Sequence, residues 1–166
     1  GSDSRRLLMQ LKYYDHPEVG RMLGKEMAAE LLTTDFFNTI DLIIPLPLAK
    51  QRQKKRGYNQ SEELAKGVAE RTNLPLDNES IIRTRNNPTQ THLSPRERQE
   101  NVKNIFQLAH PSRLEGKHVL LVDDVITTGA TLLSCAEVIA KAKGAKISIL
   151  ALATAHHHSE GATIDD

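Results

Sequence analysis

The sequence is poor in cysteine and has no long apolar run, and each shortage excludes a class of protein. Its one cysteine, Cys135, cannot form a disulfide within the chain, which excludes a small disulfide-stapled fold. No stretch approaches the ~18 apolar residues that a spanning helix needs, so membrane insertion is not expected. We therefore expect a soluble protein of a reducing compartment such as the cytoplasm.

Net charge of one sign is also lacking. The 22 Lys and Arg residues nearly balance the 21 Asp and Glu residues, so any anion-binding role must come from local clusters. The length of 166 residues predicts one domain, which we place at residues 1–155 and follow with a tail at 156–166. No apolar leader opens the chain, and Gly1-Ser2 is typical of an expression scar on a piece of a longer protein.

Hydrophobic periodicity and Gly/Pro punctuation predict alternating helices and strands. Helices are expected at 17–32, 59–71 and 131–143, the last capped by Gly144, and strands within 41–48 and at 81–82, 118–122 and 146–152. Residues 86–103 are polar and contain two prolines, which predicts a long loop. This order is typical of an α/β fold with a central, mostly parallel sheet flanked by helices.

The most informative segment is 119–131, where an apolar strand leads through two acids into a hydroxyl-rich turn and a helix. Ligands of open α/β sheets gather at the carboxyl ends of strands, which makes Asp123 and Asp124 candidate ligand-binding acids. The free N–H groups and dipole of the next helix favour a phosphate. The residues expected to hold that phosphate are Thr127, Thr128, Gly129, Ala130 and Thr131.

Two carboxylates beside a phosphate loop suit a phosphorylated ribose, because the carboxylates can accept hydrogen bonds from its two adjacent hydroxyls. The alternative is a polar strand end followed by an ordinary helix cap. Segment 119–131 resembles the 5-phosphoribosyl-1-pyrophosphate (PRPP) signature of type I phosphoribosyltransferases, in which apolar residues precede two acids and a Thr/Gly-rich loop. The resemblance implies the type I phosphoribosyltransferase fold with a flexible hood loop.

Three further segments resemble the ComF family, which includes the ComFC competence proteins and GntX-like proteins. They are 11–13 (Leu-Lys-Tyr), 45–60 with Arg-Gly-Tyr-Asn-Gln at its end, and 90–106, and the family likeness runs from about residue 7 to 153. A zinc-ribbon segment usually precedes this region in the family, but no Cys-x-x-Cys pair occurs here, so zinc is not predicted. The resemblance implies a phosphoribosyltransferase-like domain associated with DNA uptake or with metabolic roles.

A basic segment follows the first predicted strand, with five cations in residues 50–56. We expect Arg52, Arg56 and Gly57 to bind the pyrophosphate of PRPP, and Asn59 to cap the next helix. A solvated charged face would explain the lysines equally well.

The polar loop carries the hood residues that the family resemblance implies, namely Gln90, Arg98 and Asn101. Folded over bound PRPP, this loop would exclude water near the leaving pyrophosphate. The alternative is a simple connector. Two other features receive no role: Cys135 is expected to be a packed thiol, and the histidines at 156–158 a solvated cluster or tag remnant.

These features predict a protein that binds PRPP with Mg²⁺ and transfers the phosphoribosyl group to an unknown acceptor, releasing pyrophosphate. Asp123 and Asp124 would steady the ribose and meet the metal indirectly, through ribose-bound Mg²⁺. One rival is a non-catalytic module for single-stranded DNA in competence, although 4% aromatic residues and no Trp argue against base stacking. Another is a PRPP sensor. Expected partners are PRPP, the acceptor, single-stranded DNA with competence proteins, and a second copy of the chain.

Overall fold

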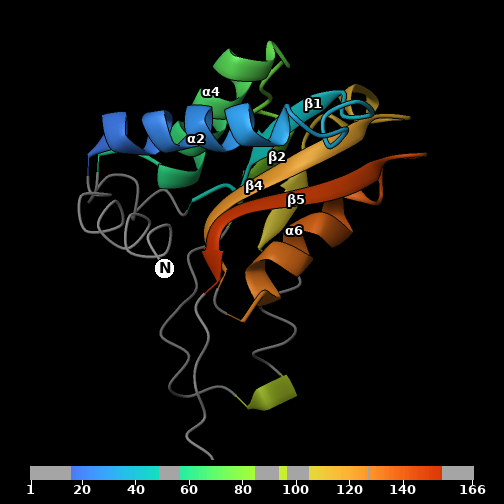
Figure 1. The fold of residues 1–166 in the computed structure, drawn as a ribbon. Helices are drawn as coiled ribbons and strands as arrows, with labels where there is room; N and C mark the ends of the chain where they lie inside the picture. Colours follow the sequence, from blue (N-terminus) through green and yellow to red (C-terminus); the bar gives the residue numbers. More distant parts are fainter. Residues whose placement is uncertain (1–15, 49–56, 85–93, 97–104, 127, 155–166) are drawn as a thin grey trace, which may run out of the picture.

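The computed structural model describes residues 16–48, 57–84, 94–96, 105–126 and 128–154. Its centre is a parallel sheet with helices on both faces (Figure 1). Within these residues the sheet has three strands in the order β1-β4-β5, with bounds β1 Leu42–Pro45, β4 His118–Ile126 and β5 Lys146–Thr154. The predicted α/β architecture with a parallel sheet is confirmed.

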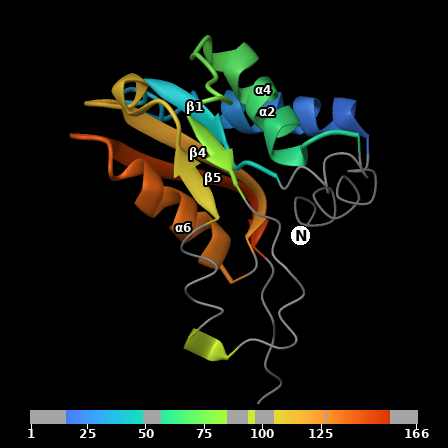
Figure 2. The same cartoon turned by 180° about the vertical axis from the view of Figure 1, so that it is seen from behind.

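Strand β1 and residues 119–122 of β4 are apolar and buried on both faces, which is why their sequences read as continuous hydrophobic runs. Ile43, Leu120 and Val122 belong to one buried cluster, whereas Ile44 and Leu121 belong to another. The first cluster lies under helices α2 (Pro17–Leu31) and α4 (Gln60–Thr72), and the second lies under α6 (Ala130–Ile139). Figure 2 shows from behind that α6 covers the face opposite α2 and α4.

Helices α2 and α4 approach each other so closely that their backbones are in contact. A Cβ atom at Gly24 would stand 2.1 Å from the carbonyl oxygen of Leu64, and one at Gly67 would stand 2.0 Å from that of Arg21. Only glycine fits at such a crossing. The glycines therefore fix where α4, and the residues at its start, lie over the sheet.

Beside the sheet, β2 (Ile81–Arg83) and β3 (Phe106–Leu108) form an antiparallel pair. The sequence predicted a strand at 81–82 but neither β3 nor the short 3-10 helix Pro111–Arg113. The polar loop predicted at 86–103 joins β2 to β3 and lies outside the described residues except for 94–96.

Several predicted boundaries were wrong, including the end of β5, which lies at Thr154 instead of 152. Strand β4 continues to Ile126 instead of ending at 122, because it keeps pairing with β5 as far as Ile126 and Thr154. Helix α6 ends at Ile139 instead of 143, because the chain enters a series of turns at Ala140. Gly144 does not cap the helix; with φ of +73° it lies in the turn just before β5.

The other helix predictions agree closely with the structure. Asn59 is the N-cap of α4 as expected, and Asn73, with φ of +60°, ends that helix in the left-handed conformation. Among the described residues, no helix combines the length and the apolar character needed to cross a lipid bilayer.

Candidate functional site

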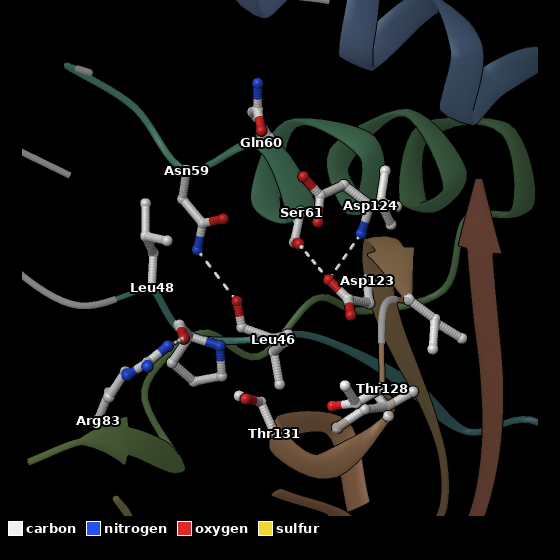
Figure 3. A pocket seen from close by; sticks show the side chains of 15 residues that line it. Leu46, Leu48, Asn59, Gln60, Ser61, Arg83, Asp123, Asp124, Thr128 and Thr131 are labelled. Carbon is white, nitrogen blue, oxygen red and sulfur yellow. Dashed lines mark hydrogen bonds between the residues drawn. The ribbon is translucent and has the colours of Figure 1, made fainter. Parts of the chain in front are cut away.

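A cavity of about 390 Å³ opens where β1 stops and β4 continues. Pro45 is the last residue of β1 and pairs with Val122, so Asp123, which pairs with Ala151 of β5, has a strand neighbour on one side only. Helix starts close the space: Asn59, Gln60 and Ser61 line it from α4, and Thr128, Gly129 and Thr131 from the beginning of α6 (Figure 3). Its volume is in the range typical of small-molecule sites.

The two predicted acids lie together in this cavity. Asp123 is 7% exposed, and its Oδ1 atom accepts hydrogen bonds from the Asp124 N–H at 2.8 Å and from the Ser61 hydroxyl at 3.3 Å. Burial, together with the neighbouring Asp124 carboxyl, raises the pKa of Asp123 from 3.8 to about 7, while the backbone N–H of Asp124 and Ser61 oppose that rise. Near neutral pH the two acids can therefore share a proton, bind a cation or accept hydrogen bonds from hydroxyl groups.

The start of α6 has the geometry of an anion-binding turn. Gly129 is the N-cap residue with φ of +79°, a left-handed conformation that L side chains rarely adopt. The first turn of α6 contains no acidic residue that would compete with an anion. Thr131 presents its hydroxyl to the cavity (Figure 3), and the helix N-terminus adds partial positive charge.

Two of the residues predicted to bind the phosphate, Ala130 and Thr127, are not shown to face the cavity. The N–H of Ala130 already donates to the Thr128 hydroxyl at 3.3 Å, and the Ala130 side chain is exposed. Thr127 lies outside the described residues.

The start of α4 faces the same cavity and is tied to the loop after β1. Asn59 accepts the Glu62 N–H at 3.3 Å and donates from Nδ2 to the Leu46 carbonyl oxygen at 3.2 Å. Gly57, in the turn before this helix, has φ of +82°, but it is exposed and does not line the cavity. Arg52 and Arg56, predicted to bind pyrophosphate, lie outside the described residues.

The hood residues Gln90, Arg98 and Asn101 also lie outside the described residues. The strands that flank their loop are held together at its base, where the Thr84 N–H donates to the Ile105 carbonyl oxygen at 2.7 Å. Arg83, the residue before Thr84, lines the cavity, so the base of the loop lies beside the site.

Sequence reasoning missed three polar residues of the cavity, namely Gln60, Ser61 and Arg83. Ser61 is two positions after the predicted cap Asn59, and the rule that a helix start faces the ligand edge of a sheet could have indicated it. Arg83 ends β2, a strand of the smaller antiparallel pair. No pattern in the sequence places that pair next to Asp123.

The remaining chemical groups agree with a site made of oxygen ligands. Cys135 is fully buried, and burial raises the pKa of its thiol to about 12, which confirms the packed thiol. The histidines at 156–158 lie outside the described residues.

Within the part of the chain that the structure describes, no group of three His, Cys, Asp or Glu side chains could hold a metal alone. Two carboxylates suit Mg²⁺, which usually shares its coordination with ligand phosphates and water.

Comparison with known proteins agrees with this geometry. The model of the phosphoribosyl transferase domain family matches residues 10–163. The chain is 35% identical over 149 residues to the DNA utilization protein YhgH of Escherichia coli O157:H7, covering 88% of this chain and 65% of that protein. It is 38% identical over 116 residues to Competence protein F of Haemophilus influenzae, covering 69% of this chain and 51% of that protein. It thus spans between half and two thirds of these relatives.

Among solved structures, the chain is similar to the glutamine PRPP amidotransferase from B. subtilis complexed with ADP and GMP. The TM-score is 0.54 at 22% identity, over 80% of this chain and 26% of that one. A likeness at this identity supports the fold.

Proposed function

Because the chain belongs to the phosphoribosyl transferase domain family, as a ComF-like member, we propose that its cavity binds PRPP together with Mg²⁺. One observation carries this proposal: the acid pair and the glycine-led start of α6 open into the same cavity. A ligand that occupies both must have hydroxyls at one position and a phosphate at the other. Phosphorylated ribose has this arrangement.

Each part of the ligand has its own residues in this proposal. The 5-phosphate lies at the start of α6, held by backbone N–H groups and by the hydroxyls of Thr127, Thr128 and Thr131, with Gly129 and Ala130 allowing close approach. Asp123 and Asp124 accept hydrogen bonds from the ribose hydroxyls. The pyrophosphate extends toward the loop after β1 and the start of α4, where Arg52, Arg56 and Gly57 are the proposed contacts.

Mg²⁺, when bound, supplies positive charge to the phosphate oxygens and lowers the cost of releasing pyrophosphate. The chain's own contribution is to orient the ribose. Negative charge on Asp123 and Asp124 stabilises the positive charge that develops at the anomeric carbon. The proposed step breaks the bond from that carbon to the pyrophosphate oxygen and forms a bond to an acceptor nitrogen, which loses a proton. Binding without this step would make the protein a PRPP sensor.

Calorimetry with PRPP tests the binding directly. We expect saturable binding in Mg²⁺ and much weaker binding when the metal is chelated. Asp123→Asn combined with Asp124→Asn should weaken binding at least about tenfold, since it removes two charged acceptors. The control is Asp35→Asn, which changes an exposed carboxylate outside the cavity. Absence of binding by the unaltered folded chain would overturn the proposal.

A panel of bases and amines then separates an enzyme from a sensor. Release of pyrophosphate that depends on one acceptor identifies a phosphoribosyltransferase. Saturable PRPP binding without release across the whole panel supports the sensor.

The names of the relatives, DNA utilization protein and Competence protein F, favour DNA as a second candidate ligand. The segment 50–56 supplies the cations for phosphate contacts. Binding of single-stranded DNA through several phosphates must weaken steeply as salt rises, and Lys54→Gln with Lys55→Gln should flatten that slope. Binding that is absent or insensitive to salt removes this candidate.

A further inference from the structure

Arg83 is the one basic side chain among the described residues that line the cavity. It comes from β2, far in the sequence from both the acid pair and the helix starts. We propose that Arg83 makes the cavity selective for a ribose 5-phosphate that carries a second anionic group at its anomeric carbon. This inference rests on the proposed function and assigns that site a specificity-determining residue.

Contacts on two sides position the Arg83 side chain. Its Nη1 atom donates to the carbonyl oxygen of Pro47 at 3.5 Å, and its guanidinium carbon lies 5.7 Å from the centre of the Phe106 ring. Phe106 is the residue that pairs with Arg83 across the β2–β3 ladder, and it is buried. A guanidinium supported by an aromatic face and a carbonyl loses little further freedom when an anion binds.

The position of Arg83 in the cavity matches the far end of the ligand. With the 5-phosphate at the start of α6 and the ribose at the acids, the anomeric substituent must project toward the remaining wall. That wall consists of Leu46, Pro47 and Leu48 after β1 and the start of α4. Figure 3 shows Arg83 beside this loop, where it contacts Pro47.

Charge explains why a cation is needed at this wall. The carboxylates Asp123 and Asp124 lie in the same cavity and repel a pyrophosphate. The planar guanidinium fork matches the geometry of phosphate oxygens and offsets that repulsion. A ligand that carries only the 5-phosphate does not reach Arg83. Its affinity therefore does not depend on this side chain.

The test compares two ligands in each variant. PRPP and ribose 5-phosphate are titrated calorimetrically, with Mg²⁺, into the unaltered chain, Arg83→Gln and Arg83→Lys. We expect Arg83→Gln to weaken PRPP binding about 10- to 100-fold, as for loss of a charge-assisted hydrogen bond, and to leave ribose 5-phosphate within about twofold. The PRPP affinity of Arg83→Lys should lie between those of the unaltered chain and Arg83→Gln, because lysine keeps the positive charge but lacks the planar pair of donors of the guanidinium. Arg71→Gln, at the opposite end of α4, is the matched control and should alter neither affinity.

The ratio of the two affinities is independent of how much protein is folded, because both ligands bind the same folded population. An unchanged ratio in Arg83→Gln overturns the inference and leaves PRPP binding intact. Absence of binding of either ligand by the unaltered chain overturns the proposed function, and the inference with it.

Discussion

At the scale of single residues, the site depends on one carboxyl that is largely kept away from water, that of Asp123. Asp123 is buried beside Asp124, and its Oδ1 atom already accepts two hydrogen bonds. Burial and the neighbouring acid together raise its pKa to about 7, so the ligand-free protein holds a proton there that an exposed aspartate would release. Binding of a cation and of ribose hydroxyls would offset the cost of ionising this buried carboxyl.

The raised pKa of Asp123 predicts a pH-dependent stability. Between pH 4 and 7 the folded chain keeps a proton that the unfolded chain loses, because the pKa is about 7 in the fold against an ordinary 3.8. The free energy of unfolding of the metal-free protein should therefore fall as pH rises through this window, by up to about 1.4 kcal/mol per pH unit. Urea titrations measure the free energy of unfolding of the unaltered chain and of Asp123→Asn at each pH. The difference between the two free energies should shrink toward pH 4. Parallel curves for the two proteins would contradict the burial argument.

Thr131 should contribute its hydroxyl to phosphate binding. Thr131→Val keeps the side-chain shape and removes the donor, so ribose 5-phosphate should bind about tenfold more weakly, within the range of one hydrogen bond to a charged group. Thr33→Val, on the exposed turn after α2, is the control, because the Thr33 hydroxyl donates only locally, to the Glu30 carbonyl oxygen. Calorimetry at fixed salt compares them. Equal affinities of the Thr131 variant and the unaltered chain would remove Thr131 from the site.

At the scale of elements, helix–helix packing places the start of α4 beside the acids. Gly24 and Gly67 allow backbone contact between α2 and α4, and the Asn59 side chain joins the start of α4 to Leu46. These contacts hold Ser61 within hydrogen-bonding distance of Asp123. The geometry of the acid pair thus depends on a helix crossing on one face of the sheet.

Gly67→Ala should destabilise the protein, the reverse of what it does in an exposed helix. Alanine normally favours a helix by about 1 kcal/mol over glycine, but here its Cβ would stand 2.0 Å from the Arg21 carbonyl oxygen. Forcing the helices apart should cost about 2 kcal/mol or more, as overpacking does. Thermal unfolding measures the change, and Arg71→Ala, at an exposed position of the same helix, should shift stability by less than about 0.5 kcal/mol. A stabilised Gly67→Ala variant would contradict the close crossing.

At the scale of the whole molecule, the sequence predicted the parallel sheet and much of the cavity wall, because those features depend on local patterns. The apolar strand before Asp123, the glycine at the start of α6 and the cap at Asn59 are each visible within a few residues. Arg83 was not predicted, because its position depends on the packing of β2 and β3 beside the sheet. The end of α6 was placed four residues too late, because turns replace the helix after Ile139 although Ala142 is still buried.

The proposed function requires that one ligand links the start of α6 to the acid pair. A crystal structure of the chain with PRPP and Mg²⁺ tests this requirement most directly. We expect the 5-phosphate within hydrogen-bonding distance of the Gly129 N–H and the Thr131 hydroxyl, with the ribose hydroxyls at Asp123 and Asp124. A ligand bound elsewhere, with this cavity holding only water under saturating PRPP, would contradict it.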